Sequence, residues 1–225
     1  MNIIVTGAGK GIGLELVKLL SANPENKILG ISRDVSALHS LPDNVIAWSF
    51  DLTKLPSVDL TDIVEVSLGG KIDVLINNAG LLVNKPYSEL STDDFDRMMM
   101  VNLKAPHLMI QQLLSYFGKG THIVNISSMG GFSGSAKFPG LSLYSTFKGA
   151  LCTLTECLAE EFKEREIAIN ALCLGAVQTE MLQEAFPGFK APVSALEMAK
   201  YIADFALNGA KYFNGKVIPI SSSTP

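Results

Sequence analysis

The stretch Thr6-Gly7-Ala8-Gly9-Lys10-Gly11-Ile12-Gly13 decides the fold class of this 225-residue chain. It follows a short apolar run, Ile3–Thr6, and opens a segment with helical periodicity, Ile12–Ala22. Glycines allow a sharp turn and a close approach to the backbone, and the first N–H groups of a helix can bind a phosphate. The spacing is G-x-x-x-G-x-G and not the more common G-x-G-x-x-G, so a turn without a ligand is the alternative interpretation. Because the turn follows the first strand directly, we expect it to bind a dinucleotide.

Apolar runs and helical patterns alternate along the rest of the chain. The runs are continuous, which is typical of parallel strands that are covered on both faces. Regular alternation predicts a doubly wound α/β sheet with right-handed crossovers, and the length suits one domain spanning residues 1–225. The expected strands are Ile3–Thr6, Lys27–Ser32, Val45–Phe50, Val74–Asn77, His122–Ser127, Ile167–Leu172 and Lys216–Ile218. The expected helices are Ile12–Ala22, Ser36–Ser40, Leu60–Leu68, Thr92–Phe117, Leu143–Arg165 and Ala195–Asn208.

Composition excludes several classes of function. With 48% hydrophobic and 18% charged residues the chain is globular, and a net charge of −4 without a basic cluster argues against a nucleic-acid partner. The mean hydropathy is +0.29, but no apolar run reaches the roughly 18 residues that a membrane span needs. No signal peptide is expected. Cys152, Cys157 and Cys173 fit no metal motif, and we expect reduced core thiols in a cytoplasmic protein.

Two cations suggest which nicotinamide cofactor the glycine turn would take. In such folds the end of the second strand contacts the adenosine ribose, and an acidic residue there favours NAD. Here Arg33 follows the second strand, 20 positions after Gly13, and Lys10 lies inside the turn. A guanidinium can bind a 2′-phosphate in a bidentate manner, so we expect NADP(H) in preference to NAD(H). Asp34 is the open alternative, since its carboxylate facing the ribose would favour NAD.

Polar residues follow the next strands at the sheet edge where ligands bind in open α/β folds. Asp51 could accept a hydrogen bond from an adenine amino group, or it could simply cap a turn. Asn77-Asn78-Ala79-Gly80 could be a ligand-binding strand end or an ordinary turn. Ser128 could present its hydroxyl to a ligand, although serine in a loop is usually a turn residue.

Tyr144-Ser145-Thr146-Phe147-Lys148 places a phenol and an ammonium one helical turn apart. A tyrosine has an unperturbed pKa of about 10, and a nearby ammonium favours the phenolate. The pair could therefore transfer protons, or its spacing could be a coincidence. Asn102 lies within an expected helix, where asparagine is not favoured. It is either exposed or disrupts the helix to turn a polar group inward.

Five of these motifs, in this order, resemble the compact branch of the short-chain dehydrogenase/reductase superfamily. They are T-G-x-x-x-G-I-G from Thr6, N-N-A-G from Asn77, the Asn102 of V-N, I-S-S from Ile126 and Y-x-x-x-K from Tyr144. The resemblance implies a sheet of order 3-2-1-4-5-6-7, a nicotinamide cofactor and a homodimer or homotetramer formed through the two long helices. It implies a catalytic tetrad of Asn102, Ser128, Tyr144 and Lys148. The implied cofactor-binding residues, together with those argued above, are Thr6, Gly7, Gly9, Lys10, Gly11, Ile12, Gly13, Arg33, Asp51, Leu52, Asn78, Ala79, Gly80, Tyr144, Lys148, Gly175, Val177 and Thr179.

Three departures from the family pattern bear on the pocket. Leu174 stands where the family usually has proline, which could loosen the backbone near the nicotinamide. The segment Ser133–Leu143 is long, which leaves Ser127 as an alternative to Ser128. The substrate lid, around residues 180–193, is short, so the site is either open or completed by a neighbouring subunit. The expected pocket-lining residues are Leu81, Leu82, Met129, Phe132, Met181, Phe186 and Phe189.

The expected function is hydride transfer between NADP(H) and a small carbonyl or alcohol substrate, with Tyr144 as the proton donor to a ketone or aldehyde. Lys148 would lower the pKa of Tyr144, and Asn102 would hold a water that relays protons. A 3-oxoacyl-carrier-protein reductase is an alternative within the family. A cofactor-binding regulator without activity is disfavoured because such proteins usually lack the Tyr and the Lys. The family's longer branch of epimerases and dehydratases needs an additional domain.

Overall fold

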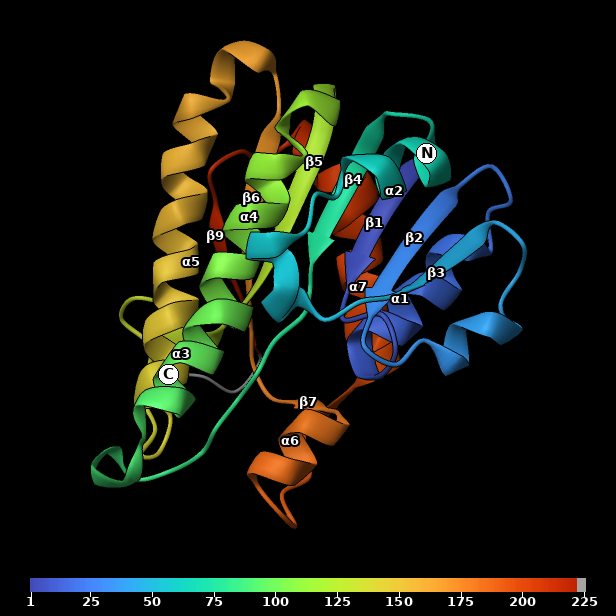
Figure 1. The fold of residues 1–225 in the computed structure, drawn as a ribbon. Helices are drawn as coiled ribbons and strands as arrows, with labels where there is room; N and C mark the ends of the chain where they lie inside the picture. Colours follow the sequence, from blue (N-terminus) through green and yellow to red (C-terminus); the bar gives the residue numbers. More distant parts are fainter. Residues whose placement is uncertain (222–225) are drawn as a thin grey trace.

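The computed structural model describes residues 1–221 and shows one seven-stranded parallel sheet of order β3-β2-β1-β4-β5-β6-β9 (Figure 1). This is the predicted order, with β9 as the seventh strand of the sheet. Every neighbouring pair in it is parallel. The strands are β1 (Asn2–Thr6), β2 (Lys27–Ser32), β3 (Val45–Ser49), β4 (Ile72–Asn77), β5 (Phe117–Ser128), β6 (Ala168–Leu174) and β9 (Val217–Ile220).

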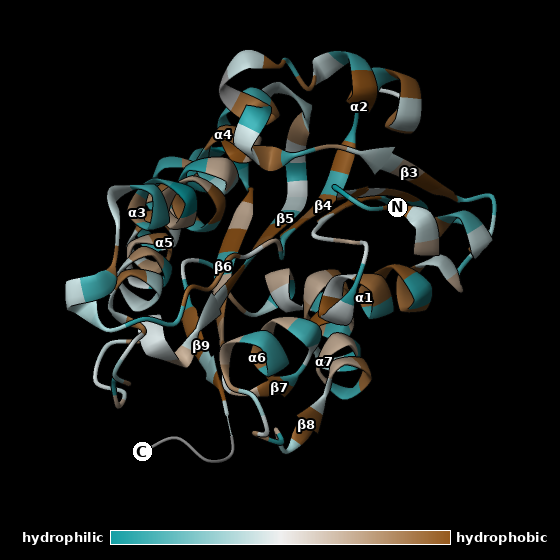
Figure 2. Cartoon of the chain, turned by 60° about the horizontal axis from the view of Figure 1, so that its bottom comes forward, coloured by the Kyte–Doolittle hydropathy of each residue, from teal (hydrophilic) through white to brown (hydrophobic). Residues whose placement is uncertain are grey.

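Helices cover both faces of the sheet, which explains why the strands are continuously apolar. Ile3 and Val5 of β1 pack into the core beneath α1 and α7, whereas Ile4 between them packs into the core beneath α2, α4 and α5. Hydrophobic colour accordingly runs along the strands in Figure 2, while the helices carry hydrophilic residues as well. The helices are α1 (Gly11–Ser21), α2 (Thr61–Leu68), α3 (Thr92–Met99), α4 (Ala105–Gln112), α5 (Ser142–Glu161), α6 (Glu180–Ala185) and α7 (Ala195–Asn208). No helix among the described residues 1–221 is long and apolar enough to cross a bilayer.

The single helix predicted for Thr92–Phe117 is wrong. The chain forms α3, then a π-helical turn over Met100–Lys104, then α4, and Phe117 already belongs to β5. Pro106 lies in the first turn of α4, where its missing N–H costs little. A π-turn inside a helix often marks a functional site, and this one contains Asn102.

A small parallel ribbon outside the main sheet was not predicted. It pairs β7 (Val177–Gln178) with β8 (Val193–Ser194), and α6 lies in the segment that it closes. Figure 1 shows α6 beyond the ends toward which the strand arrows point. The ribbon therefore holds α6 over the carboxyl edge of the sheet.

The prediction that all three cysteines lie in the core holds for two of them. Cys152 and Cys173 are buried, whereas Cys157 is exposed on α5, and all three are free thiols. Cys157 faces outward because it lies five positions after Cys152, beyond the buried stripe of the helix.

Candidate active site

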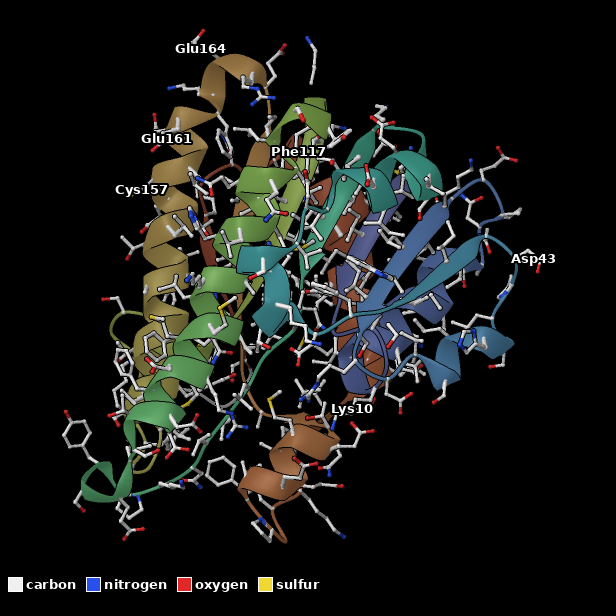
Figure 3. The ribbon with its side chains drawn as sticks, viewed as in Figure 1. Lys10, Asp43, Phe117, Cys157, Glu161 and Glu164 are labelled. Carbon is white, nitrogen blue, oxygen red and sulfur yellow. The ribbon has the colours of Figure 1, made fainter. Side chains whose placement is uncertain are left out.

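A cavity of about 680 Å³ opens at the carboxyl edge of the sheet, between the glycine turn, the strand ends, α5 and α6. It brings together most of the residues that the sequence predicts for the site. Lys10 lies at this end of the sheet, beside α6 (Figure 3). The predicted site residues that line the cavity are Gly7, Lys10, Gly11, Ile12, Arg33, Asp51, Leu52, Asn78, Ala79, Gly80, Ser128, Tyr144, Lys148, Gly175, Val177 and Thr179. Those that are not part of its lining are Thr6, Gly9, Gly13 and Asn102.

The glycine turn exposes the start of α1 to the cavity. Gly7 and Gly11 have φ values of 68° and 55°, a region that favours glycine. A Cβ at Gly13 would lie 2.1 Å from the carbonyl oxygen of Gly7, so this glycine serves the packing of helix against turn. No side chain caps the N-terminus of α1, so its first N–H groups lack an intrahelical or capping partner. Uncapped donors that border a cavity suit an anionic ligand.

Thr6 holds the turn against the end of β4 from behind. Its buried hydroxyl oxygen accepts hydrogen bonds from the N–H groups of Asn78 and Ala79, both at 3.1 Å. The Asn78 amide donates in return to the carbonyl of Thr6 at 3.0 Å. Two strand ends are thus tied together, and Thr6 acts on the shape of the cavity without bordering it.

Arg33 and Asp34 are arranged differently with respect to the cavity. Arg33 lines it, whereas Asp34 does not. The Asp34 carboxylate accepts the N–H of Ser36 at 2.9 Å, and this hydrogen bond lowers the pKa of Asp34. Lys10 also lines the cavity and makes only a long, exposed ion pair with Glu184 at 3.7 Å. The end of the cavity next to the glycine turn and the end of β2 therefore carries two cations.

Asp51 is a cap residue, as one of the two interpretations expected, and it also borders the cavity. It caps the short helix Leu52–Ser57 by accepting the N–H of Thr53 at 3.0 Å, and it also lines the cavity. The hydrogen bonds from Thr53 and the nearby Arg33 charge hold the pKa of Asp51 below its usual value.

Tyr144 and Lys148 lie on the same face of α5, with the Lys148 ammonium 5.9 Å from the centre of the Tyr144 ring. Burial raises the pKa of Tyr144 to about 12, and a hydrogen bond with Ser128 offsets only part of that shift. Burial also lowers the pKa of Lys148 to about 8, while its ammonium donates to the carbonyl of Ile126 at 2.7 Å. The expectation of a lowered Tyr144 pKa is therefore wrong for the protein alone, because burial of the phenol raises it.

Ser127 and Ser128 point to different places. The Ser127 hydroxyl is buried and donates to the carbonyl of Lys148 at 2.9 Å. Ser128 is half-buried, interacts with Tyr144 and accepts the N–H of Gly130 at 3.1 Å. Ser128 is thus the serine whose hydroxyl is next to the phenol.

Asn102 is fully buried and turned inward by the π-turn, as one of the two sequence interpretations expected. Its side-chain oxygen accepts the N–H of Leu81 at 3.0 Å, and its amide donates to the carbonyl of Leu81 at 2.7 Å. A Cβ at Gly80 would lie 3.5 Å from the Asn102 oxygen and 3.7 Å from the Lys148 nitrogen. Asn102 therefore fixes the segment after β4, which lies close to the Lys148 ammonium.

Leu174 replaces proline without loosening the backbone. It is buried at the end of β6 and stays in register with Ser128 of β5 and Ile220 of β9. The next residue, Gly175, donates its N–H to the carbonyl of Ile220 at 2.9 Å. Thr179 then caps α6 by accepting the N–H of Leu182 at 3.3 Å.

Six of the seven expected pocket-lining residues border the cavity: Leu81, Leu82, Met129, Met181, Phe186 and Phe189. Phe132 does not, and packs instead against a small core cluster around Met129 and Ala171. Sequence reasoning missed Arg97, Val101, Phe138 and Leu141, which also line the cavity. The i, i+4 spacing of Arg97 and Val101 within an expected helix was the available signal for two of them.

Comparison with known proteins gives consistent matches. The family described as short chain dehydrogenase matches residues 1–189. A 3-oxoacyl-[acyl-carrier-protein] reductase of Thermotoga maritima is 30% identical over 239 residues, covering 96% of this chain and 94% of the relative. The chain is similar in structure to a 3-ketoacyl-(acyl-carrier-protein) reductase from Brucella melitensis complexed with NADH, with a TM-score of 0.82, 25% identity and coverage of 97% and 96%. It is also similar to ElxO with NADP bound, with a TM-score of 0.84, 28% identity and coverage of 97% and 96%.

Proposed function

The chain belongs to the short-chain dehydrogenase family and is an NAD(P)-dependent oxidoreductase; we propose that it reduces a ketone or aldehyde with NADP(H). One observation carries this proposal. A single cavity contains the Tyr144 phenol, the Lys148 ammonium, the Ser128 hydroxyl and the uncapped start of α1.

The residues present fit a nicotinamide dinucleotide. The uncapped N–H groups of α1 and the glycine turn would hold the pyrophosphate. Asp51 and Leu52 would border the adenine, and Gly175, Val177 and Thr179 the nicotinamide side. When bound, the cofactor supplies the hydride.

NADP is preferred over NAD on the basis of charge. Arg33 and Lys10 line the cavity, and within residues 1–221 the one ion pair that involves either of them is the long, exposed contact of Lys10 with Glu184 at 3.7 Å. Asp34, the residue that would favour NAD, has its carboxylate engaged by Ser36. A guanidinium next to a 2′-phosphate forms charge-assisted hydrogen bonds.

Ser128 and Tyr144 would hold the carbonyl oxygen of the substrate. Ser128 donates a hydrogen bond that orients this oxygen, and Tyr144 gives its proton to the same atom as negative charge develops there. With a pKa near 12 the phenol is protonated at neutral pH, so it is in the form that a reduction needs.

Lys148 and Asn102 would assist the proton transfer from Tyr144. The Lys148 ammonium faces Tyr144 and is mostly protonated at neutral pH, since its pKa is about 8. We propose that it stabilises the phenolate left after proton transfer and binds the hydroxyls of the nicotinamide ribose. The oxygen and the nitrogen of the Asn102 side chain each bond to Leu81, so we propose that a water relay uses the main chain of the π-turn.

The substrate is proposed to be uncharged around its carbonyl and largely apolar. Leu81, Leu82, Met129 and Phe186 line this part of the cavity. The segment 180–193, with α6, would act as a short lid. The Asn84 amide donates to the Ala185 carbonyl at 2.9 Å, which closes one side of the mouth.

The chain is proposed to be cytoplasmic and to form a homodimer or homotetramer. Buried Cys152 and Cys173 are unbonded, which fits a reducing compartment. Phe95 on α3 is 41% exposed, and a second copy could cover it by packing α3 and α5 against its own.

A second candidate is a 3-oxoacyl-carrier-protein reductase, favoured by a relative of that name that matches 96% of the chain. An acidic carrier needs a basic docking surface. The lid segment 180–193 itself contains one cation, Lys190, which makes this candidate the weaker one.

The test is a screen of aldehydes, ketones and 3-oxoacyl thioesters with NADPH and NADH in parallel. We expect faster turnover with NADPH and at least one simple carbonyl substrate. Tyr144→Phe should keep cofactor binding, measured by fluorescence titration, and lose nearly all turnover. Tyr87→Phe, which changes an exposed phenol, is the matched control. No oxidation of either cofactor with any substrate would overturn the proposal, as would wild-type rates in Tyr144→Phe.

A further inference from the structure

Two buried thiols lie next to each other beneath the cavity, and the mechanism proposed above does not use them. The Cys152 sulfur on α5 is 3.5 Å from the Cys173 sulfur on β6. Cys152 is 6% exposed and Cys173 is not exposed at all. Both belong to a small core cluster with Met129 and Ala171, separate from the two large cores.

The thiol pair is connected to the site by hydrogen bonds. The Cys152 thiol donates to the Ser127 hydroxyl oxygen at 3.3 Å, and that hydroxyl donates to the carbonyl of Lys148 at 2.9 Å. Cys152 lies one turn after Lys148 on the same face of α5, and Cys173 pairs with Ser127 in the sheet. Any movement of Cys152 toward β6 therefore acts on the turn of α5 that carries Tyr144 and Lys148.

We propose that Cys152 and Cys173 form a redox-modification site, in which a hydroperoxide converts the two thiols into a disulfide that shuts off the reductase. The loss of activity rests on the proposed function, whereas formation of the disulfide does not.

The chemistry balances with hydrogen peroxide as the oxidant. The Cys152 thiolate attacks one peroxide oxygen, the O–O bond breaks, and Cys152 becomes a sulfenic acid as water leaves. Cys173 then attacks that sulfur, the S–S bond forms, the S–O bond breaks, and the Cys173 proton leaves with a second water. Two thiols lose two electrons and the peroxide gains them.

The surroundings distinguish the attacking thiol from the resolving one. The hydrogen bond from Cys173, with further help from Ser127 and the Lys148 charge, lowers the pKa of Cys152 to about 7. The neighbouring Cys152 and burial raise the pKa of Cys173. Cys152 is thus the nucleophile, because the thiolate is the reactive form.

The bond would displace the catalytic turn. A disulfide has its sulfurs about 2.0 Å apart, so the two must approach by about 1.5 Å from their present 3.5 Å. The Cys152 thiol would also lose the proton that it donates to Ser127. A misplacement of about 1 Å in an active site can reduce a rate by roughly 100-fold.

Access favours a small oxidant. Ser127, Lys148 and Met129 line the cavity and separate it from the two sulfurs. Cys157 is the natural control, because it is exposed on the same helix and only four residues from Glu161 at the helix end.

The test treats the whole protein with a few equivalents of hydrogen peroxide and measures its intact mass and disulfide-linked peptides without reductant. We expect a monomer that loses the mass of two hydrogen atoms, a Cys152–Cys173 peptide, and a roughly 100-fold loss of reductase activity that dithiothreitol restores. Cys157→Ser should behave identically, and Cys152→Ser should keep its mass at this site and its activity during treatment. Cys173→Ala should not lose two hydrogens and should instead gain oxygen at Cys152.

Three results would overturn the proposal: no loss of two hydrogens in the wild type, a disulfide that uses Cys157, or an intramolecular disulfide with full activity. Because the wild-type mass decides whether the bond forms, a variant that fails to fold does not weaken the test. Should the protein reduce no carbonyl at all, the peptide analysis still decides the modification site, and only the proposed function fails.

Discussion

Replacing Arg33 by alanine should reduce the preference for NADPH over NADH and leave the catalytic step unchanged. Arg33 lines the cavity beside the glycine turn, and its guanidinium would make charge-assisted hydrogen bonds to a 2′-phosphate that NADH lacks. Hydrogen bonds to charged groups contribute about 1.5–3 kcal/mol, and 1.4 kcal/mol is a factor of ten. Arg33 is exposed, so solvent screening favours the lower end of that range.

We therefore expect kcat/KM for NADPH to fall by about 10- to 30-fold in Arg33→Ala, with kcat/KM for NADH unchanged within about twofold. The assay follows oxidation of each cofactor at 340 nm with one saturating carbonyl substrate. Asp34→Asn is the matched control, because the Asp34 carboxylate accepts the N–H of Ser36 and does not line the cavity. Its loss should leave the NADPH-to-NADH ratio of kcat/KM unchanged.

An unchanged NADPH-to-NADH ratio in Arg33→Ala would refute this reasoning. So would a rise of NADPH over NADH in Asp34→Asn, since that result would place Asp34 at the ribose.

Three further predictions concern stability and pH. Gly13→Ala puts a Cβ 2.1 Å from the Gly7 carbonyl and should cost about 1–3 kcal/mol in urea unfolding, while Gly118→Ala, with open space around it, should cost less than 1 kcal/mol. Reductase kcat/KM should be constant at neutral pH and fall as pH rises through about 8, where Lys148 loses its proton. Lys148→Arg should move that fall to higher pH. A kcat/KM that stays constant up to pH 10 would contradict this role of Lys148. His122 is buried, and burial lowers its pKa below 6.5. Its contribution to the free energy of unfolding is therefore complete above pH 6.5 and is lost as pH falls through the lowered pKa, by at most about 1.4 kcal/mol per pH unit. In His122→Gln the urea midpoint should change less between pH 7 and 5 than in the wild type. An unchanged pH dependence of the midpoint would exclude His122 as the cause.

A parallel sheet covered on both faces could be predicted because consecutive strand residues are apolar, whereas the order of its strands was expected from the family resemblance. Ile3 and Ile4 pack into different cores, and no exposed face interrupts the pattern. The ends of those strands then place Ser128, Asn78 and Arg33 at one edge, so most of the cavity lining follows from the order alone.

What could not be predicted depends on contacts between distant segments. The π-turn at Asn102 is fixed by Leu81, 21 positions earlier, and no local propensity encodes that bond. The meeting of Cys152 with Cys173 likewise spans 21 positions. The pKa of Tyr144 was predicted with the wrong sign because the sequence shows the nearby charge but not the depth of burial.

Some residues of the glycine-turn motif do not have the ligand-contact role that the motif suggests. Thr6, Gly9 and Gly13 belong to the motif that identifies the turn, yet none of them lines the cavity. A Cβ at Gly9 would meet the carbonyl oxygen of Asp34 at 2.0 Å. These residues are needed so that the turn can pack against its neighbours. A sequence motif alone does not distinguish residues needed for this packing from residues that contact a ligand.

The ribbon of β7 and β8 makes the segment over the cavity an exchangeable module. Its two ends, Gln178 and Ser194, are paired with each other and do not depend on α6 for their position. Lengthening a loop whose ends are already held costs only about 0.6 kcal/mol for each doubling. We therefore expect that residues 180–192 can be replaced by longer or differently shaped segments while the sheet and α5 stay intact. On the function proposed above, substrate choice could then change independently of the chemistry.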